Sequence, residues 1–285
     1  MIRAVKGHGT GNDFVLLPDL ERQLDLTAEL VRALCDRRTG IGGDGVLRVV
    51  LAAADPEGAP LADQARWFMD YRNADGSVAE MCGNGIRVYA RYLLDHGLEQ
   101  GGEFAVATRS GVKRVRPEDD GRITVDLGPA QLLATDRKVR VGDHSWSATE
   151  VDLGNPHVVA FVDGLDQAGP LLDPPTVEPA FEHGVNVEFV ATVADRHIAM
   201  RVHERGVGET RSCGTGACAA AAAAAARDGQ AGPWAYTVDV PGGRLTVTRR
   251  ADGHLELTGP AVLVAELEID PRALAESRTT TTPPA

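Results

Sequence analysis

The chain has 285 residues, of which 43% are apolar and 25% are charged, a composition typical of a globular protein with one large core or two smaller ones. Its formal net charge of -12, with no Lys/Arg cluster beside aromatic residues, argues against nucleic acid or an anionic membrane as a partner. Residues 1–17 show neither a signal-peptide pattern nor a membrane span, so we expect a cytoplasmic protein.

The first predicted element is a helix that begins after Thr27 and runs to Arg38. Thr27 is a favourable N-cap, Leu26 and Val31 are spaced to form a hydrophobic staple, and Gly40 can end the helix. Farther along the chain, residues 66–71 are predicted to form a strand.

A glycine-rich segment, Met81–Ile86 (MCGNGI), opens a second predicted helix that ends at Gly97. The helical period separates an apolar face from a polar face, and it places Arg87 on the polar one. The apolar face holds Ile86, Tyr89, Ala90, Leu93 and Leu94, and the polar face also holds Arg91 and Asp95. Residues 122–127 alternate as in a strand.

The second half of the chain repeats this order at an offset of about 131 residues. Ser212–Ala217 (SCGTGA) aligns with Met81–Ile86, and the alanine run Ala219–Ala226 then takes the place of the central helix, which ends here at Gly229. The other aligned pairs are 104–111 with 236–243, 120–121 with 252–253, 128–130 with 259–261, 66–71 with 198–203 and, more loosely, 11–14 with 154–157. We interpret the alanine run as a tightly packed helix rather than a spacer.

The repeat predicts an α+β fold of two pseudo-symmetric lobes, with antiparallel or mixed strands wrapped around a central helix in each. The active site is expected in the cleft between the lobes. We assign residues 1–130 to the N-terminal lobe, joined by the C-terminal segment 263–277, and residues 131–262 to the C-terminal lobe. The Thr- and Pro-rich end, 278–285, is expected to be disordered.

Two of the four cysteines, Cys82 and Cys213, stand at equivalent places where a central helix begins, whereas Cys35 and Cys218 fit the pattern of small core residues. The free N–H groups and dipole of a helix start favour a carboxylate and a thiolate. Two thiols around one carboxylate suit inversion at an α-carbon, because one can remove a proton while the other delivers one to the opposite face.

We expect no cofactor and no metal. The chain has only Lys6, Lys113 and Lys138 as lysines, none in a recognisable Schiff-base site, and its cysteines lack zinc-finger spacing. The expected partner is a small-molecule amino-acid substrate, and we expect the protein to form a homodimer.

Over nearly its whole length the chain resembles the diaminopimelate epimerase family. The resemblance rests on Gly9–Phe14 (GTGNDF), Asn73–Gly76 (NADG), Cys82–Arg87 (CGNGIR), Gly154–His157 (GNPH), Asn186, Glu204–Thr210 (ERGVGET) and Cys213–Ala217 (CGTGA). It implies an isomerase that interconverts LL- and meso-diaminopimelate without a cofactor, for lysine and peptidoglycan synthesis.

The resemblance also implies the roles of individual residues. Cys82 and Cys213 would be the catalytic pair, and His157 and Glu204 would tune the thiols. The implied carboxylate-holding residues are Gly83, Asn84, Gly214 and Thr215, and the implied pocket residues are Asn12, Asn73, Asn155, Asn186, Glu204 and Arg205. The chain departs from many members at Gly45, where they carry a substrate-contacting glutamine.

Four other functions remain open from the sequence. The chain could be a proline- or histidine-type racemase, although Glu204 and Arg205 supply a distal carboxylate clamp that such enzymes do not need. An isomerase like the phenazine-biosynthesis relatives is disfavoured by the two cysteines. A dithiol redox protein usually has its cysteines close in sequence, and a non-catalytic binding module has no need of both thiols.

Overall fold

The computed structural model describes residues 1–274, which divide into two compact units. Unit 1 comprises Met1–Ile123 and the described residues from Ala261 onward, and unit 2 comprises Thr124–Pro260. The predicted disordered tail, 278–285, lies outside the described residues, as do residues 275–277 of the segment expected to join the first lobe.

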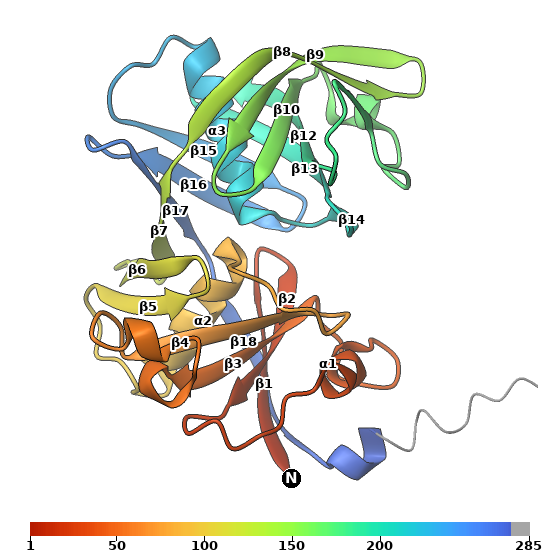
Figure 1. The fold of residues 1–285 in the computed structure, drawn as a ribbon. Helices are drawn as coiled ribbons and strands as arrows, with labels where there is room; N and C mark the ends of the chain where they lie inside the picture. Colours follow the sequence, from red (N-terminus) through yellow and green to blue (C-terminus); the bar gives the residue numbers. More distant parts are fainter. Residues whose placement is uncertain (275–285) are drawn as a thin grey trace, which may run out of the picture. The chain divides into compact units, whose positions relative to one another are not determined.

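Unit 1 is a mixed sheet around one helix (Figure 1). Its strands pair in the order β18 (Val262–Ile269), β1 (Ile2–Gly9), β2 (Asn12–Pro18), β3 (Gly45–Leu51), β4 (Trp67–Asn73), β5 (Phe104–Thr108) and β6 (Gly111–Pro117). The β2–β3 and β4–β5 pairs are parallel and the others are antiparallel. The central helix α2 (Gly83–Asp95) lies against β1, β2, β3 and β18.

Unit 2 repeats this arrangement. Its strands pair in the order β8 (Gln131–Val141), β9 (His144–Asp152), β10 (Pro156–Phe161), β12 (Asn186–Ala194), β13 (His197–Glu204), β15 (Trp234–Val240) and β16 (Gly243–Arg249). The β10–β12 and β13–β15 pairs are parallel, at the same two steps as in unit 1. The order and direction of the strands therefore confirm the repeat read from the sequence.

Further elements complete the two units. They are α1 (Ala28–Cys35), β7 (Ile123–Pro129), β11 (Thr176–Glu178), β14 (Gly208–Thr210), β17 (His254–Gly259) and the 3-10 turns η1 (Ala52–Ala54), η2 (Ala59–Leu61) and η3 (Leu165–Ala168). Because β7 pairs with β17, residues 124–130 belong to unit 2, whereas the sequence repeat sets the boundary after residue 130.

The central helix of unit 2, α3 (Gly214–Arg227), contains the alanine run and is buried on all sides. Ala217 and the residues through Ala225 are at most 5% exposed, and the helix contacts β9, β10, β12, β13, β15, β16 and β17. Since alanine has only a methyl side chain, the strands can approach the helix closely from every side. The interpretation of the run as a packed helix is confirmed.

Two details of the predicted helices differ from expectation. Arg87 is fully buried although it lies on the polar face of the helical period, because three nearby oxygens accept hydrogen bonds from its guanidinium. Helix α1 has the expected N-cap at Thr27 but ends at Cys35 rather than Arg38. Asp36 is extended, and its carboxylate accepts hydrogen bonds from the N–H groups of Arg38 and Thr39, which stabilises the turn instead of the helix.

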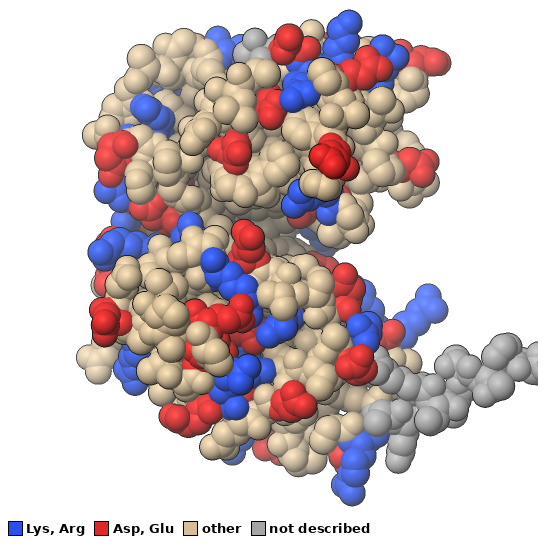
Figure 2. All heavy atoms as spheres, in the orientation of Figure 1, with Lys and Arg blue, Asp and Glu red and all other residues tan. Residues whose placement is uncertain are grey.

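The surface mixes charges of both signs. On the face shown in Figure 2, Lys and Arg side chains alternate with Asp and Glu side chains over each unit. Within residues 1–274 no helix is long and apolar enough to cross a membrane.

Candidate active site

Cys82 is the N-cap of α2. Its Sγ accepts a hydrogen bond from the backbone N–H of Gly85 at 3.4 Å, in the position that a Ser or Thr oxygen usually takes at a helix start. A Cβ at Gly85 would lie 3.3 Å from the Cβ of Cys82, so glycine is what allows this approach. The thiol is only partly buried, and it stands at the positive end of the helix dipole.

Asn12 is hydrogen-bonded both to Cys82 and to the first turn of α2. The Thr10–Gly11 turn has positive φ at both positions, as a two-residue hairpin requires, and it presents Asn12 at the start of β2. The Oδ1 of Asn12 accepts hydrogen bonds from the Cys82 thiol at 3.5 Å and from the Asn84 amide at 3.2 Å. Its Nδ2 donates to Asp44 at 2.6 Å, which fixes the orientation of the amide.

Arg87 stabilises the first turn of α2 through hydrogen bonds. It donates to the Gly83 carbonyl at 3.0 Å, to Asn84 Oδ1 at 2.9 Å and to Thr10 Oγ1 at 3.4 Å. These bonds tie the helix start to the hairpin that carries Asn12. A buried guanidinium is thereby connected to Cys82 through the two asparagines.

Cys213 is the N-cap of α3 and repeats the geometry of Cys82. Its Sγ accepts from the N–H of Gly216 at 3.3 Å and lies 3.5 Å from the hydroxyl of Thr215. Asn155, the counterpart of Asn12, donates to the Thr215 hydroxyl at 3.4 Å. Cys213 is more buried than Cys82, with 7% of its surface exposed.

Burial raises the pKa of the Cys213 thiol well above its ordinary value, and two carboxylates add to the effect. They belong to Glu204 at the end of β13 and to Glu188 on β12. The hydrogen bonds from Thr215 and Gly216 oppose the shift. This raised pKa favours the thiol form of Cys213 at neutral pH.

His157 and Glu188 form a fully buried pair in unit 2. The distance from His157 Nδ1 to Glu188 Oε1 is 2.7 Å, and both side chains are 0% exposed. Among the described residues, His157 Nε2 and Glu188 Oε2 have no hydrogen-bond partner.

Asn186 and Arg205 meet at the end of β13. The amide of Asn186 donates to the Pro156 carbonyl at 3.0 Å and accepts from the backbone N–H of Arg205 at 3.0 Å. Asn186 thus holds the turn that carries Arg205. The exposed guanidinium of Arg205 forms no ion pair with any residue in the range 1–274, whereas the Thr210 hydroxyl donates to the carboxylate of the adjacent Glu204.

Asn73 and Gly45 lie opposite each other where β3 begins and β4 ends. The amide of Asn73 donates to Ser77 Oγ at 3.0 Å within the following turn, and no hydrogen bond in the structure joins it to Cys82. A Cβ at Gly45 would lie 2.5 Å from the Arg72 carbonyl oxygen, so a longer side chain fits there only if the strand pair shifts.

Each unit therefore assembles a half-site from residues distant in sequence. The first contains Asn12, Cys82, Gly83 and Asn84, and the second contains Asn155, His157, Asn186, Glu204, Arg205, Cys213, Gly214 and Thr215. Sequence reasoning missed Asp44, Arg87 and Glu188. A signal existed for Glu188, because it lies two residues after Asn186 in a strand and so shares its face.

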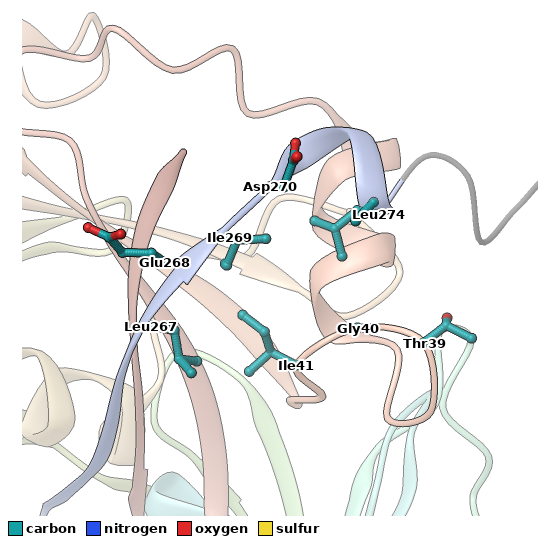
Figure 3. Close-up of a pocket in the computed structure, with 9 residues that line it drawn as sticks. Thr39, Gly40, Ile41, Leu267, Glu268, Ile269, Asp270 and Leu274 are labelled. Atoms are coloured by element: carbon teal, nitrogen blue, oxygen red, sulfur yellow. The ribbon is translucent and has the colours of Figure 1, made fainter.

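A hollow elsewhere in unit 1 holds none of these residues (Figure 3). It lies between the 39–41 loop and the end of β18, and its walls include Ile41, Leu267, Ile269 and Leu274. Its lining includes the carboxylates of Glu268 and Asp270 but none of the cysteines, so it lies apart from the residues that the sequence singles out. No group of three or more His, Cys, Asp or Glu side chains in the described part of the chain is arranged to hold a metal ion.

Comparison with known proteins identifies the family. The family model for diaminopimelate epimerase matches residues 4–133 and 149–264. The chain is 59% identical over 276 residues to the diaminopimelate epimerase of Streptomyces coelicolor, a match that covers 94% of this chain and 96% of the relative. The chain belongs to the diaminopimelate epimerase family. Another family member, from Thermobifida fusca, is 50% identical over 278 residues, covering 96% of this chain and 100% of that one.

Solved structures show how far the fold of the diaminopimelate epimerase family extends. A hydroxyproline epimerase from Agrobacterium vitis matches with a TM-score of 0.68 at 16% identity, covering 96% of this chain and 94% of that one. A phenazine biosynthesis protein from Bacillus anthracis matches with a TM-score of 0.70 at 17% identity, covering 94% and 99%. These likenesses support the predicted fold class.

Proposed function

We propose that the chain is an isomerase that interconverts LL- and meso-diaminopimelate, with Cys82 and Cys213 as its two acid/base groups and without a cofactor. Membership of the diaminopimelate epimerase family supports the reaction. The observation that supports the residues is the repeated N-cap geometry, in which each cysteine accepts a hydrogen bond from the N–H three residues later.

That geometry supplies two needs of proton transfer at an α-carbon. The first N–H groups of a helix have no carbonyl partner within the helix, so those at Gly83–Asn84 and Gly214–Thr215 can bind the carboxylate next to the reacting carbon. Negative charge that develops on this carboxylate as the proton leaves is then stabilised by groups already in place. The cysteine that caps the same helix is next to the carbon that reacts.

The reaction balances without a redox step. One sulfur, as thiolate, takes the α-proton and becomes a thiol, while the other sulfur, as thiol, gives its proton to the opposite face and becomes a thiolate. The reverse reaction begins from the exchanged protonation states. Because the raised pKa of Cys213 favours its thiol form, we assign this residue the role of proton donor in the first step from the free protein.

Specificity is proposed to reside in Arg205. Its guanidinium is exposed and unpaired within the described residues, and its backbone is held by Asn186. A planar guanidinium can bind a carboxylate through two parallel hydrogen bonds, which suits the distal carboxylate of diaminopimelate. Asn12, Asn73, Asn155 and Glu204 are proposed to complete the pocket, and His157 and Glu204 to tune the thiols.

We further propose a cytoplasmic homodimer. A chain with four cysteines and no disulfide among its described residues is compatible with a reducing compartment. On β18, Val262 and Val264 are 44% and 60% exposed, and an interface between two copies would bury such side chains.

A substrate panel in heavy water tests the function. LL-diaminopimelate, meso-diaminopimelate, L-proline and L-histidine are incubated separately with the protein, and proton NMR follows the loss of each α-proton signal. We expect exchange with both diaminopimelate isomers and at least about tenfold slower exchange with the monocarboxylic amino acids, because they leave Arg205 unpaired. Preferential exchange of proline or histidine would refute the assigned substrate.

A further inference from the structure

The repeat places different side chains at equivalent strand positions near the two cysteines. In unit 1, Phe14 pairs with Gly45 across the parallel β2–β3 step, and Leu47 follows two residues later. In unit 2, His157 pairs with Asn186 across the equivalent β10–β12 step, and Glu188 follows two residues later. Phe14 and Leu47 of unit 1 therefore correspond to His157 and Glu188 of unit 2.

The contacts at the two helix starts confirm this equivalence. A Cβ at Gly85 would lie 3.4 Å from both Leu47 and Phe14, which are apolar. A Cβ at Gly216 would lie 2.7 Å from Glu188 Oε1 and 3.3 Å from the Sγ of Cys213. The scaffold thus accommodates an apolar pair at this place, and unit 2 has an ionisable pair instead.

A buried ionisable pair is costly when its other polar atoms are unsatisfied. Glu188 and His157 are both fully buried, and one polar atom of each has no hydrogen-bond partner within residues 1–274. Burying polar groups without partners lowers stability, and unit 1 shows that the fold does not need them. The pair therefore calls for a functional explanation.

The carboxylate defines which nitrogen of His157 is available. Glu188 Oε1 lies 2.7 Å from Nδ1, and an ionised carboxylate can only accept, so Nδ1 carries the hydrogen of this bond. In the neutral ring, Nε2 is then the nitrogen with a lone pair. It is also the nitrogen without a partner in the described residues.

We propose that Glu188 is a positioning residue of the epimerase reaction, which holds Nδ1–H of His157 and so presents Nε2 as the proton-accepting edge of the ring. This inference rests on the proposed function, in which His157 tunes the thiols, and it names Nε2 as the atom that does so. Carboxylates that orient histidine rings in this way fix the tautomer and raise the basicity of the free nitrogen.

The same carboxylate acts on Cys213. Glu188 from β12 and Glu204 from β13 are the titratable groups that raise the pKa of this thiol, and His157 from β10 is the titratable group paired with Glu188. Removal of the Glu188 charge is thus expected to affect both the ring and the thiol.

The first test reads the ring directly by 15N NMR of histidine-labelled protein, with the His157 signals assigned from their loss in His157→Gln. At a pH where the ring is neutral, we expect hydrogen on Nδ1 and none on Nε2 in the wild-type protein. In Glu188→Gln the tautomers should mix or reverse. A wild-type ring with its hydrogen on Nε2 would overturn the proposal, and this result needs no variant at position 188 to fold.

The second test is kinetic. Glu188→Gln should lower kcat for diaminopimelate by about 10- to 100-fold with a smaller change in KM, and it should move the pH–rate profile. The matched control is Glu150→Gln, which removes another unit 2 carboxylate, 12% exposed and paired with Arg137 at 2.7 Å on the adjacent strand. It should leave kcat and the profile unchanged.

The outcomes separate this inference from the proposed function. Wild-type kcat and pH profile in a folded Glu188→Gln protein would overturn the role of Glu188 in the reaction. If the wild-type protein does not turn over diaminopimelate but the ring readout is as expected, the proposed function fails while the orientation of His157 by Glu188 stands.

Discussion

The two half-sites have the same backbone arrangement, but their polar side chains differ in charge. Around Cys82 the polar groups are the amides of Asn12 and Asn84, backed by the buried cation of Arg87. Around Cys213 they are the hydroxyl of Thr215 and the carboxylates of Glu188 and Glu204. In the position that corresponds to Arg87, unit 2 has Cys218, which is uncharged and fully buried.

This difference shows how a duplicated scaffold can serve a reaction that needs unlike partners. A two-base inversion begins with one thiolate and one thiol, so two identical environments would not define the starting state. The anionic surroundings of Cys213 favour the thiol there. The helix starts, which we propose as the carboxylate-binding groups, are the part that both units keep.

The largest expected effect comes from removing either sulfur. Cys82→Ala and Cys213→Ala should each lower turnover of diaminopimelate by at least about 100-fold, because each removes one of two necessary proton-transfer groups. Cys218→Ala, in the same helix as Cys213, is the control and should keep most of the activity. Near-wild-type rates from either of the first two variants would contradict the two-base mechanism and, with it, the comparison of half-sites.

A smaller effect is expected from Arg205, which only unit 2 provides. Arg205→Lys keeps the charge but loses the bidentate fork, and loss of such a charge-assisted contact costs about 1.5–3 kcal/mol, or roughly 10- to 150-fold in kcat/KM. Steady-state kinetics with LL-diaminopimelate measures this loss of kcat/KM. The melting temperature of the variant should not change, because the guanidinium is exposed. Unaltered kcat/KM would remove Arg205 from substrate recognition.

The smallest expected effect is an upward shift of the pH at which Cys213 of the wild-type protein is alkylated. Alkylation by iodoacetamide follows the thiolate, so its pH midpoint reports the pKa of the thiol. Because burial and two carboxylates raise this pKa, modification of Cys213 should have a midpoint above the value of about 8.5 for an ordinary cysteine. Peptide mapping over a pH series, with denatured protein as the reference, provides the measurement. A midpoint at or below the reference would contradict the assignment of Cys213 as the resting thiol.

Much of the fold could be predicted from the sequence because the repeat is visible in it. The strands expected at 66–71 and 198–203 are β4 and β13, and the glycine-rich segments do begin α2 and α3. Periodicity records which face of an element is apolar, and the matching order of elements shows which strands are equivalent. The boundary after Ile123 could not be read this way, since it depends on the pairing of β7 with β17.

The site was only partly predictable. The Cys-Gly segments mark positions where the backbone can approach a ligand, and they pointed to the two cysteines. The roles of the surrounding pocket residues came from the resemblance to the diaminopimelate epimerase family. Arg87 was assigned to a polar face, because a helical period cannot show that Thr10, from the turn between β1 and β2, accepts its hydrogen bond. Glu188 is the single acid in the buried first half of β12, and its partner His157 comes from a different strand.

The central claim is that two thiols in unlike environments act together, one removing the α-proton and the other delivering a proton. Its most direct test is the order in which deuterium enters the two isomers. LL-diaminopimelate is mixed with the wild-type protein in heavy water, and both isomers are analysed by NMR and mass spectrometry at low conversion. If one sulfur removes the proton and the other supplies its own, the meso product carries deuterium at the inverted carbon from the start while the remaining LL isomer keeps its protium. Deuterium that appears equally early in both isomers would mean that one base serves both faces, and it would contradict the account.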